Sequence, residues 1–368
     1  MSSGLFTRLF LAASIAAASA AGASGAERVV NVYNWSDYID PGVLADFTAE
    51  TGIAVNYDVF DSNDIVETKL LAGGSGYDVV ISSDIYVYRE IAAGALLALD
   101  KARLPNLRHA WPEIDQALRA YDPENRYALN YMWGTTGLGY NIDKVAELLP
   151  DAPLDSWALL FDPRNAARLA ECGITVLDAP DDVIPAALTY LGLDPQTDDP
   201  AAIRQAGTVV ETIRPFIQKF DSSNTINALA NGDVCLTLGY SGDVIQARDR
   251  AAESKSGIRI AYSVPKEGAA MSFDNFVIPE DAPHPDEAHI FLDYMLRPDI
   301  AARNSNHVAY ANGNRDSQPL LDEDVIGDPA IYPDAETMAR LFTLPPRDMH
   351  LQRTINRLWA DLKSGEFR

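Results

Sequence analysis

Trp35, Ser36, Asp37 and Tyr38 stand together where a run of buried-type residues ends. The preceding segment, residues 28–34, contains three valines and has the β-branched character of a strand. A carboxylate holds an ammonium group by charge-assisted hydrogen bonds, and aromatic faces attract cations and contact alkyl carbons. An indole, a hydroxyl, a carboxylate and a phenol beyond such a strand therefore suggest a binding surface for an organic cation.

The same residue types recur after the other predicted strands. They are Ser82 and Ser83, then Asp178, Asp181 and Asp182, then Tyr240 and Asp243. The set has aromatic rings, hydroxyls and carboxylates but no Lys, Arg or His, so it suits an alkyl amine with more than one positive charge and suits an anion badly. Asp274 lies inside a predicted strand, where a carboxylate is costly unless it is exposed at an edge or paired.

Each of these residues also has a purely structural explanation. Trp35 could belong to the core, and Asp37 could cap the turn before Pro41. Asp182 and Asp243 each open a predicted helix, where an acidic residue is favoured by the helix dipole. Only their shared position at strand ends favours a binding site over these alternatives.

The elements that must position these residues alternate between strand and helix. Predicted strands cover residues 28–34, 53–60, 77–82, 173–179, 234–241, 257–264 and 271–278. Predicted helices cover residues 41–51, 63–74, 181–191 and 242–254, with another beginning near Pro285. The first helix should have Asp40 as its N-cap and Gly52 just past its end. This alternation indicates an α/β protein with parallel sheets in two lobes and a cleft between them, and ligands of such sheets bind beyond the carboxyl ends of the strands.

Length and charge restrict the function further. The 368 residues are 47% hydrophobic and suit two domains. The formal charge of −24 becomes −25 if Arg8 is removed with the N-terminal segment, so nucleic acid and anionic membranes are poor partners.

The N-terminal 26 residues are typical of a secretory signal. Arg8 precedes the apolar run LFLAASIAAASAA, and small residues lead up to Ala26. The run is shorter than the roughly 20 residues that span a bilayer, although a membrane anchor is the alternative. No other segment is apolar enough to cross a membrane. We therefore expect an exported protein that does not insert into the membrane after its signal is removed.

Cys172 and Cys235 are the two cysteines of the chain. An exported protein meets an oxidising compartment, so one disulfide is expected, with two separate buried thiols as the alternative.

Enzymatic interpretations find little support in the motifs. The five histidines, at positions 109, 284, 289, 307 and 350, lack metal-ligand spacing, and no cofactor motif is complete. The segment GYSGD is not a nucleophile elbow. Asp181 and Asp182 could serve a secreted glycosidase, but adjacent residues of a helix point in different directions.

Long segments of the chain resemble the polyamine-binding proteins of ABC importers, and most closely the putrescine-binding branch. These segments are YNWSDYI, YDVFDSN, YMWGTTGLGYN, CGITVLDAP, LANGDVC, GYSGDV, VPKEG and HVAYAN, in the family's order. The resemblance implies a periplasmic, two-lobed binding protein of type II that acts as a monomer, uses no cofactor, catalyses no reaction and delivers its ligand to a membrane permease. A receptor that signals instead of transporting is the alternative. The implied lobes are residues 27–133 plus 258–305 and residues 134–257 plus 306–368, after a signal at 1–26.

The resemblance also implies roles for individual residues. Trp35 and Tyr240 would contact the methylenes of the ligand, and Tyr38 and Tyr310 would complete the aromatic wall. Asp243, Asp274 and Ser36 would bind one ammonium group. Asp37 and Asp182 would bind the other, with Ser83 and Ser222 nearby. The family pattern also pairs Cys172 with Cys235.

Three departures from the putrescine-binding pattern bear on specificity. Tyr240 replaces a Trp, Asp182 replaces a Glu, and Ser272 replaces a Phe. A shorter carboxylate and a missing ring predict a wider, wetter cavity. Putrescine is therefore expected first and spermidine second, while cadaverine and agmatine remain open.

Overall fold

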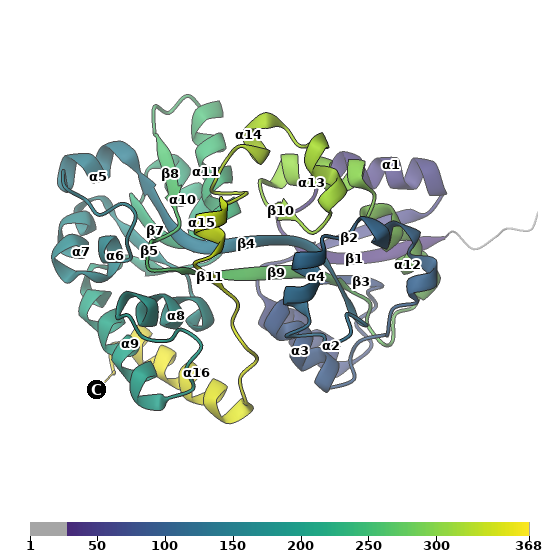
Figure 1. Cartoon of the computed structure of the whole chain (residues 1–368), viewed down its shortest axis with the longest axis horizontal. Helices are drawn as coiled ribbons and strands as arrows, with labels where there is room; N and C mark the ends of the chain where they lie inside the picture. The colour runs from purple at the N-terminus through teal and green to yellow at the C-terminus, as the bar shows by residue number, and fades with distance from the viewer. Residues whose placement is uncertain (1–27, 368) are drawn as a thin grey trace, which may run out of the picture.

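The computed structural model describes residues 28–367 (Figure 1). It is a mixed α/β fold in which one long sheet runs through the molecule and helices cover both of its faces. The predicted secretion signal, residues 1–26, lies outside the described residues. Among the helices of the described part, none is long and apolar enough to cross a membrane.

The first third of the chain follows the predicted alternation closely. Its elements are β1 (Val29–Trp35), α1 (Pro41–Thr51), β2 (Ala54–Phe60), α2 (Asn63–Ala72), β3 (Val79–Ser83), α3 (Asp84–Ala92), η1 (Lys101–Arg103), η2 (Pro105–His109) and α4 (Pro112–Leu118). The caps of α1 are confirmed: the Asp40 side chain accepts a hydrogen bond from the Gly42 amide, and Gly52 has the left-handed φ of 70°.

The middle of the chain contains one long strand and several shorter elements. They are β4 (Ala128–Asn141), α5 (Ile142–Leu148), α6 (Ala158–Phe161), α7 (Pro163–Leu169), η3 (Ala170–Cys172), β5 (Ile174–Val176), α8 (Pro180–Tyr190), α9 (Pro200–Ile213), η4 (Arg214–Phe216), β6 (Lys219–Phe220), α10 (Thr225–Asn231), β7 (Leu236–Tyr240), α11 (Ser241–Glu253) and β8 (Ile260–Ser263). Strand β4 was not predicted, although all fourteen of its residues are buried.

The last third returns to the sheet and ends in a long helix. Its elements are β9 (Ala269–Val277), α12 (Pro285–Met295), α13 (Pro298–Val308), β10 (Ala311–Asn312), η5 (Arg315–Leu320), α14 (Glu323–Ile326), α15 (Ala335–Met338), β11 (Leu341–Phe342) and α16 (Met349–Ser364). Helix α16 packs against α9 and α8, far from the start of the chain.

The sheet has the order β2-β1-β3-β9-β4-β7-β5-β6. Strand β1 is parallel to β2 and β3, and β5 is parallel to β6 and β7. Strands β4 and β9 run antiparallel to each other, β9 runs antiparallel to β3, and β4 runs antiparallel to β7. The expected parallel sheets are thus found at the two ends, and an antiparallel pair joins them at the centre.

Strand β4 connects two separate hydrophobic cores. Its residues Leu129 and Met132 belong to the core beneath β1, β2 and β3, whereas Leu138 and Tyr140 belong to the core around β5, β7 and α8. This arrangement agrees with the predicted two lobes. The exact lobe boundaries stay a prediction. Strand β8, which follows the predicted crossing at residue 257, pairs with residues 138–141 of β4.

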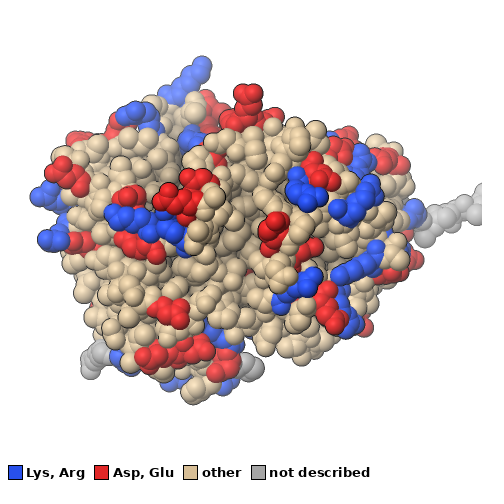
Figure 2. Space-filling model, viewed as in Figure 1, with Lys and Arg blue, Asp and Glu red and all other residues tan. Residues whose placement is uncertain are grey.

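Charged side chains of both signs are mixed over the molecular surface. Figure 2 shows Lys and Arg beside Asp and Glu on most of the visible face. Ion pairs such as Arg103 with Asp286 and Arg297 with Glu50 account for part of this mixture. Part of the acidic surface is therefore paired with basic side chains of the same chain.

The predicted disulfide between Cys172 and Cys235 is present. It links Cys172, the last residue of η3, to Cys235, the residue before β7, and Cys235 is part of the second core. The bond closes a loop across 63 residues of sequence.

We predict that replacing both Cys172 and Cys235 by Ala lowers the free energy of unfolding by about 2–4 kcal/mol, because the unfolded chain regains the entropy that the closed loop removes. Urea denaturation followed by circular dichroism measures this difference. Reduction of the unaltered protein should lower the midpoint similarly, and an unchanged midpoint after both treatments would contradict the prediction.

Candidate ligand-binding site

Asp274 lies in β9 at the point where β1 and β3 end. Tyr38 donates to one of its oxygens at 2.9 Å, and Ser83 donates to the other at 2.6 Å. The indole N–H of Trp35 lies 3.4 Å from that second oxygen. Ser83 stands opposite Asp274 in the β3–β9 pairing, so the strand register itself brings the hydroxyl to the carboxylate. Asp274 is paired, as a carboxylate inside a strand requires.

Asp182 occupies the first turn of α8, and residues of two strands, β4 and β7, donate hydrogen bonds to it. Thr136 donates to it at 2.7 Å and Tyr240 at 2.9 Å. Thr136 of β4 and Tyr240 of β7 are directly opposite each other in the antiparallel pairing. Two cross-strand neighbours therefore fix both oxygens of a carboxylate at the N-terminus of a helix.

Asp243 lies in the first turn of α11 and accepts a hydrogen bond from Tyr310 at 3.0 Å. The Tyr310 ring packs closely against Gly242, where an added Cβ would lie 1.9 Å from a ring carbon. Its edge also contacts the ring of Tyr38, with centroids 5.0 Å apart. The segment GYSGD thus has glycine at residue 242 because the phenol that reaches Asp243 requires the space.

Burial controls the protonation of these three carboxyl groups. It raises the pKa of Asp182 to about 6 against the opposing hydrogen bonds of Thr136 and Tyr240. It also raises the pKa of Asp243 to about 6, with a further rise from the Asp274 carboxylate. The pKa of Asp274 is raised by burial as well, although three hydrogen bonds oppose the shift. Each group is an anion that the folded protein holds at a cost in free energy.

Within residues 28–367, the three carboxylates have no ion-pair partner. The arginines in this region pair with other acids: Arg250 lies 3.1 Å from Asp37, and Arg347 lies 3.3 Å from Asp181. The side-chain donors to Asp182, Asp243 and Asp274 are phenols, hydroxyls and the Trp35 indole N–H, all of them neutral, and each carboxylate keeps acceptor capacity for another donor. The arrangement favours a ligand that brings its own positive charges.

Asp37 lies in the turn after β1 and contacts α11. It is exposed, has a φ of 54°, and forms an ion pair with Arg250 of α11. Its charge also raises the pKa of Asp243. The structure therefore associates Asp37 with Asp243, whereas the sequence grouped it with Asp182. Its contact with a ligand stays a prediction.

The predicted serines occupy four different positions. Ser83 donates a hydrogen bond to Asp274, and its expected place near the ammonium group bound by Asp37 and Asp182 stays a prediction. Ser36 is exposed in the turn after β1. Ser222 accepts a hydrogen bond from the Asp178 amide at 3.0 Å, and Ser272 stands opposite Gly134 in the β9–β4 pairing. The ligand contacts expected of Ser36 and Ser222 and the tuning of specificity expected of Ser272 stay predictions.

Two carboxylates that follow the predicted strands face other partners. Asp178 binds Lys363 at 2.7 Å and the indole N–H of Trp359, both in α16. Asp181 binds Gln352 and Arg347. The contacts of Asp178 and Asp181 attach the C-terminal segment. The glycosidase hypothesis required Asp181 together with Asp182, and Asp181 is occupied by these structural contacts.

Sequence reasoning missed Thr136 and Arg250. Thr136 belongs to YMWGTTGLGYN, a segment of the resemblance in which no residue was given a role. Arg250 pairs with a residue 213 positions away, and nothing local marks that pairing.

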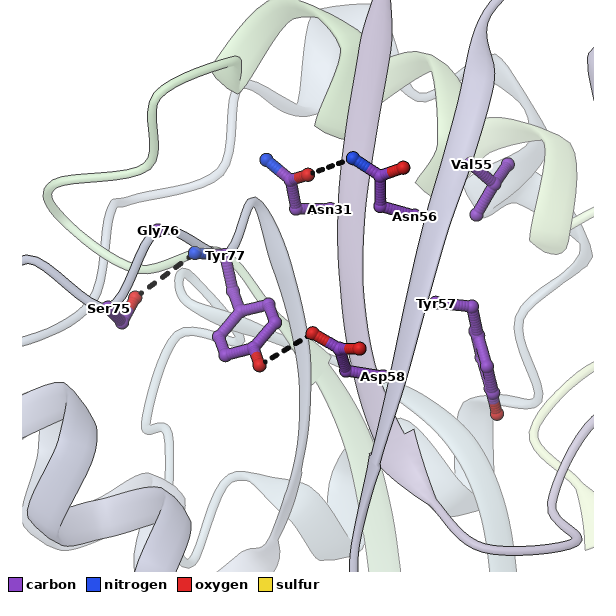
Figure 3. A pocket seen from close by; sticks show the side chains of 8 residues that line it. All are labelled: Asn31, Val55, Asn56, Tyr57, Asp58, Ser75, Gly76 and Tyr77. Atoms are coloured by element: carbon purple, nitrogen blue, oxygen red, sulfur yellow. Dashed lines mark hydrogen bonds between the residues drawn. The ribbon is translucent and has the colours of Figure 1, made fainter.

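A shallow surface hollow of about 590 Å³ lies elsewhere, at the outer edge of the sheet (Figure 3). Asn31, Asn56, Asp58 and Tyr77 line it, and their side chains are joined by hydrogen bonds, Asn56 to Asn31 and Tyr77 to Asp58. None of the three buried carboxylates borders this hollow, and its open form gives a small ligand little enclosure. No group of His, Cys, Asp and Glu among residues 28–367 is arranged to hold a metal ion.

Residues 42–333 match the family model of the bacterial extracellular solute-binding proteins. The chain belongs to this family. It is 45% identical over 363 residues to the putrescine-binding periplasmic protein SpuD of Pseudomonas aeruginosa strain UCBPP-PA14, covering 98% of this chain and 99% of that one. It is also 45% identical over 360 residues to the putrescine-binding periplasmic protein PotF of Escherichia coli K12, covering 97% of each.

Solved structures support the same assignment of fold. A putative spermidine/putrescine ABC transporter protein from Listeria monocytogenes superimposes with a TM-score of 0.79 at 31% identity, covering 91% of this chain and 99% of that one. These relatives confirm the predicted two-lobed binding-protein fold. Because the family consists of solute-binding proteins, the chain is a solute-binding protein and not an enzyme, as the sequence predicted.

We predict that Asp182→Asn stabilises the ligand-free protein at neutral pH. The folded pKa of about 6 exceeds the unfolded value near 3.9, so ionisation of Asp182 costs stability as the pH rises through about 6. The difference in free energy of unfolding between the variant and the unaltered protein should rise in favour of the variant by about 1–2 kcal/mol from pH 4 to pH 7.5. Urea denaturation at both pH values measures this gain.

Asp143→Asn is the matched control, because its hydrogen bond to Arg259 lowers the pKa of Asp143. That variant should lose stability relative to the unaltered protein as the pH rises, which is the opposite sign. Equal behaviour of the two variants would contradict the assignment of Asp182 as a destabilising buried anion.

Proposed function

We propose that this chain is a periplasmic receptor that captures polyamines, putrescine first and spermidine second, and delivers them to the membrane permease of an ABC importer. The observation that carries the proposal is the set of three buried carboxylates that have aromatic hydrogen-bond donors and, among residues 28–367, no ion-pair partner. The receptor acts as a monomer and is exported by the signal at residues 1–26. The names of the most similar relatives support the ligand class and the compartment.

The placement of the carboxylates supports a ligand with two charges. Asp243 and Asp274 affect each other electrostatically, so they form one anionic end of the site. Asp182 is held separately by Thr136 and Tyr240. One ammonium group at each end would offset the cost of burial, and the rings of Trp35, Tyr38, Tyr240 and Tyr310 would contact the methylenes between.

The shape of the Asp182 end leaves the length of the amine open. Asp182 already accepts two hydrogen bonds, and its side chain is one methylene shorter than that of Glu. Relatives at 41% and 33% identity are named for putrescine with agmatine and putrescine with cadaverine. Those two amines are therefore the alternatives within the same ligand class.

We predict that putrescine binds at least about 100-fold more tightly than butylamine, because the missing ammonium group leaves a buried carboxylate unpaired. Isothermal titration calorimetry with putrescine, cadaverine, spermidine, agmatine, butylamine and an amino acid gives the order of affinities. Binding of the amino acid together with failure of every amine would overturn the proposed function.

We further predict that Asp274→Asn and Trp35→Ala each weaken putrescine binding by about tenfold or more, because the first removes a charge and the second a ring surface. Thermal unfolding should show that both variants fold. Asp286→Asn, at an exposed carboxylate that pairs with Arg103, is the control and should bind normally. Unchanged titrations for both site variants would refute the assignment of these residues.

A further inference from the structure

Strand β4 exchanges its neighbours on both edges between Thr135 and Thr136. Up to Thr135 it pairs with β9 and β10, and from Thr136 onward it pairs with β7 and β8. The exchange falls between Met132, which belongs to the first core, and Leu138, which belongs to the second. Both threonines are only 1% exposed. The backbone at this exchange point therefore joins the two cores.

The Tyr262 hydroxyl of β8 binds the exchange point at two atoms of Thr135. It donates to the Thr135 carbonyl oxygen at 2.8 Å. The Thr135 hydroxyl also lies 2.8 Å from the phenol oxygen, and it is the donor there because the single phenol proton is used at the carbonyl. Burial raises the pKa of the Tyr262 phenol, so this proton is retained. The Thr135 amide donates to the Ser241 hydroxyl at 3.3 Å, so the main chain of Thr135 is held by two side chains.

The glycines of the segment GTTG, which begins at Gly134, give two phenols access to the exchange point. A Cβ on Gly137 would lie 2.5 Å from the Tyr262 hydroxyl. A Cβ on Gly134 would lie 2.9 Å from a ring carbon of Tyr310, the phenol that donates to Asp243. Contacts this close require glycine at both positions. The space for Tyr262 is therefore built into the sequence of β4.

The residue after Thr135 reaches the candidate site. Thr136 donates to Asp182 at 2.7 Å and stands opposite Tyr240, which is the second donor to that carboxylate. Consecutive residues of a strand cannot move independently, so the bonds that hold Thr135 also limit where the Thr136 hydroxyl can lie. An unbroken chain of contacts thus runs from Tyr262 through Thr135 and Thr136 to Asp182.

We propose that Tyr262 is a positioning residue for ligand binding. Its hydroxyl bonds to Thr135 and, among the described residues, donates to none of the three site carboxylates. It acts through Thr135 on Thr136, which holds the Asp182 carboxylate in place. Without the phenol hydroxyl, the exchange point can shift and each ligand must order Asp182 again. This inference rests on the proposed polyamine-binding function, in which Asp182 binds one ammonium group.

Two single variants measure the contribution of each hydroxyl. Tyr262→Phe keeps the ring, and we expect it to weaken putrescine binding at pH 7.5 about three- to tenfold, the effect of losing one hydrogen bond. Thr136→Val removes the donor to Asp182 directly and should weaken binding about tenfold. Isothermal titration calorimetry measures both affinities. Unchanged affinity of Tyr262→Phe would overturn the proposal.

The double variant separates positioning from general support of the fold. If Tyr262 acts through Thr136, its loss has little further effect once the Thr136 hydroxyl is gone. The protein with both Tyr262→Phe and Thr136→Val should therefore bind putrescine within about twofold of Thr136→Val alone. Losses that multiply in the double variant would contradict the proposed route.

Tyr332→Phe is the matched control. The Tyr332 hydroxyl accepts a hydrogen bond from the Asn312 amide at 3.3 Å, and both Tyr332 and Tyr262 pack against the core that contains Phe273. The control should lower the thermal unfolding midpoint about as much as Tyr262→Phe does while it binds putrescine normally. Equal losses of affinity in the two variants would mean general support of this core and would overturn the positioning role.

The pH dependence of binding gives a second readout. Burial raises the pKa of Asp182, the hydrogen bond from Thr136 opposes the rise, and Asp181, which Arg347 pairs, adds to it. When Tyr262→Phe releases Thr136, the loss of putrescine affinity on acidification should begin at a higher pH than in the unaltered protein. An unchanged pH profile contradicts the proposal. Failure of the unaltered protein to bind any amine would instead refute the proposed function itself.

Discussion

The burial of carboxylates without protein cations is the constraint on which this structure depends. A buried charge is costly unless it is paired, and phenols and hydroxyls compensate only part of that cost. Asp182, Asp243 and Asp274 are nevertheless all held in this way, with their pKa values raised by burial. The folded protein therefore gives up stability at positions where a cationic ligand can restore it, which is typical of a binding site.

The antiparallel centre of the sheet explains how two lobes can share such a site. Strands β4 and β9 pass from one hydrophobic core to the other, so residues on them are neighbours of both lobes. Thr136 on β4 reaches Asp182 of the second lobe, and Asp274 on β9 receives Tyr38 and Ser83 of the first. Closure of two lobes about connecting strands is a known motion of periplasmic binding proteins. In this chain it would bring the anionic ends toward one ligand.

Sequence patterns predicted the parts of the fold that depend on local signals. Pro41 and Gly52 bound α1 because Pro favours a helix start and Gly adopts a positive φ at its end. Asp274 was singled out because a strand carboxylate needs a partner, and the structure supplies three donors. By contrast, β4 is buried along its whole length, so it shows no alternation of polar and apolar residues that would mark a strand. The pairing of Asp37 with Arg250 depends on tertiary structure alone.

The central claim is that a positively charged ligand and protons compete for the same buried carboxylates. The most direct test measures the affinity for putrescine from pH 5 to pH 8 and counts the protons exchanged on binding at pH 6. Because burial raises the pKa of Asp182 and Asp243 to about 6, the account predicts proton release at pH 6 and an affinity at least tenfold weaker at pH 5 than at pH 7.5. An affinity that is independent of pH over this range, with no proton released, would contradict it.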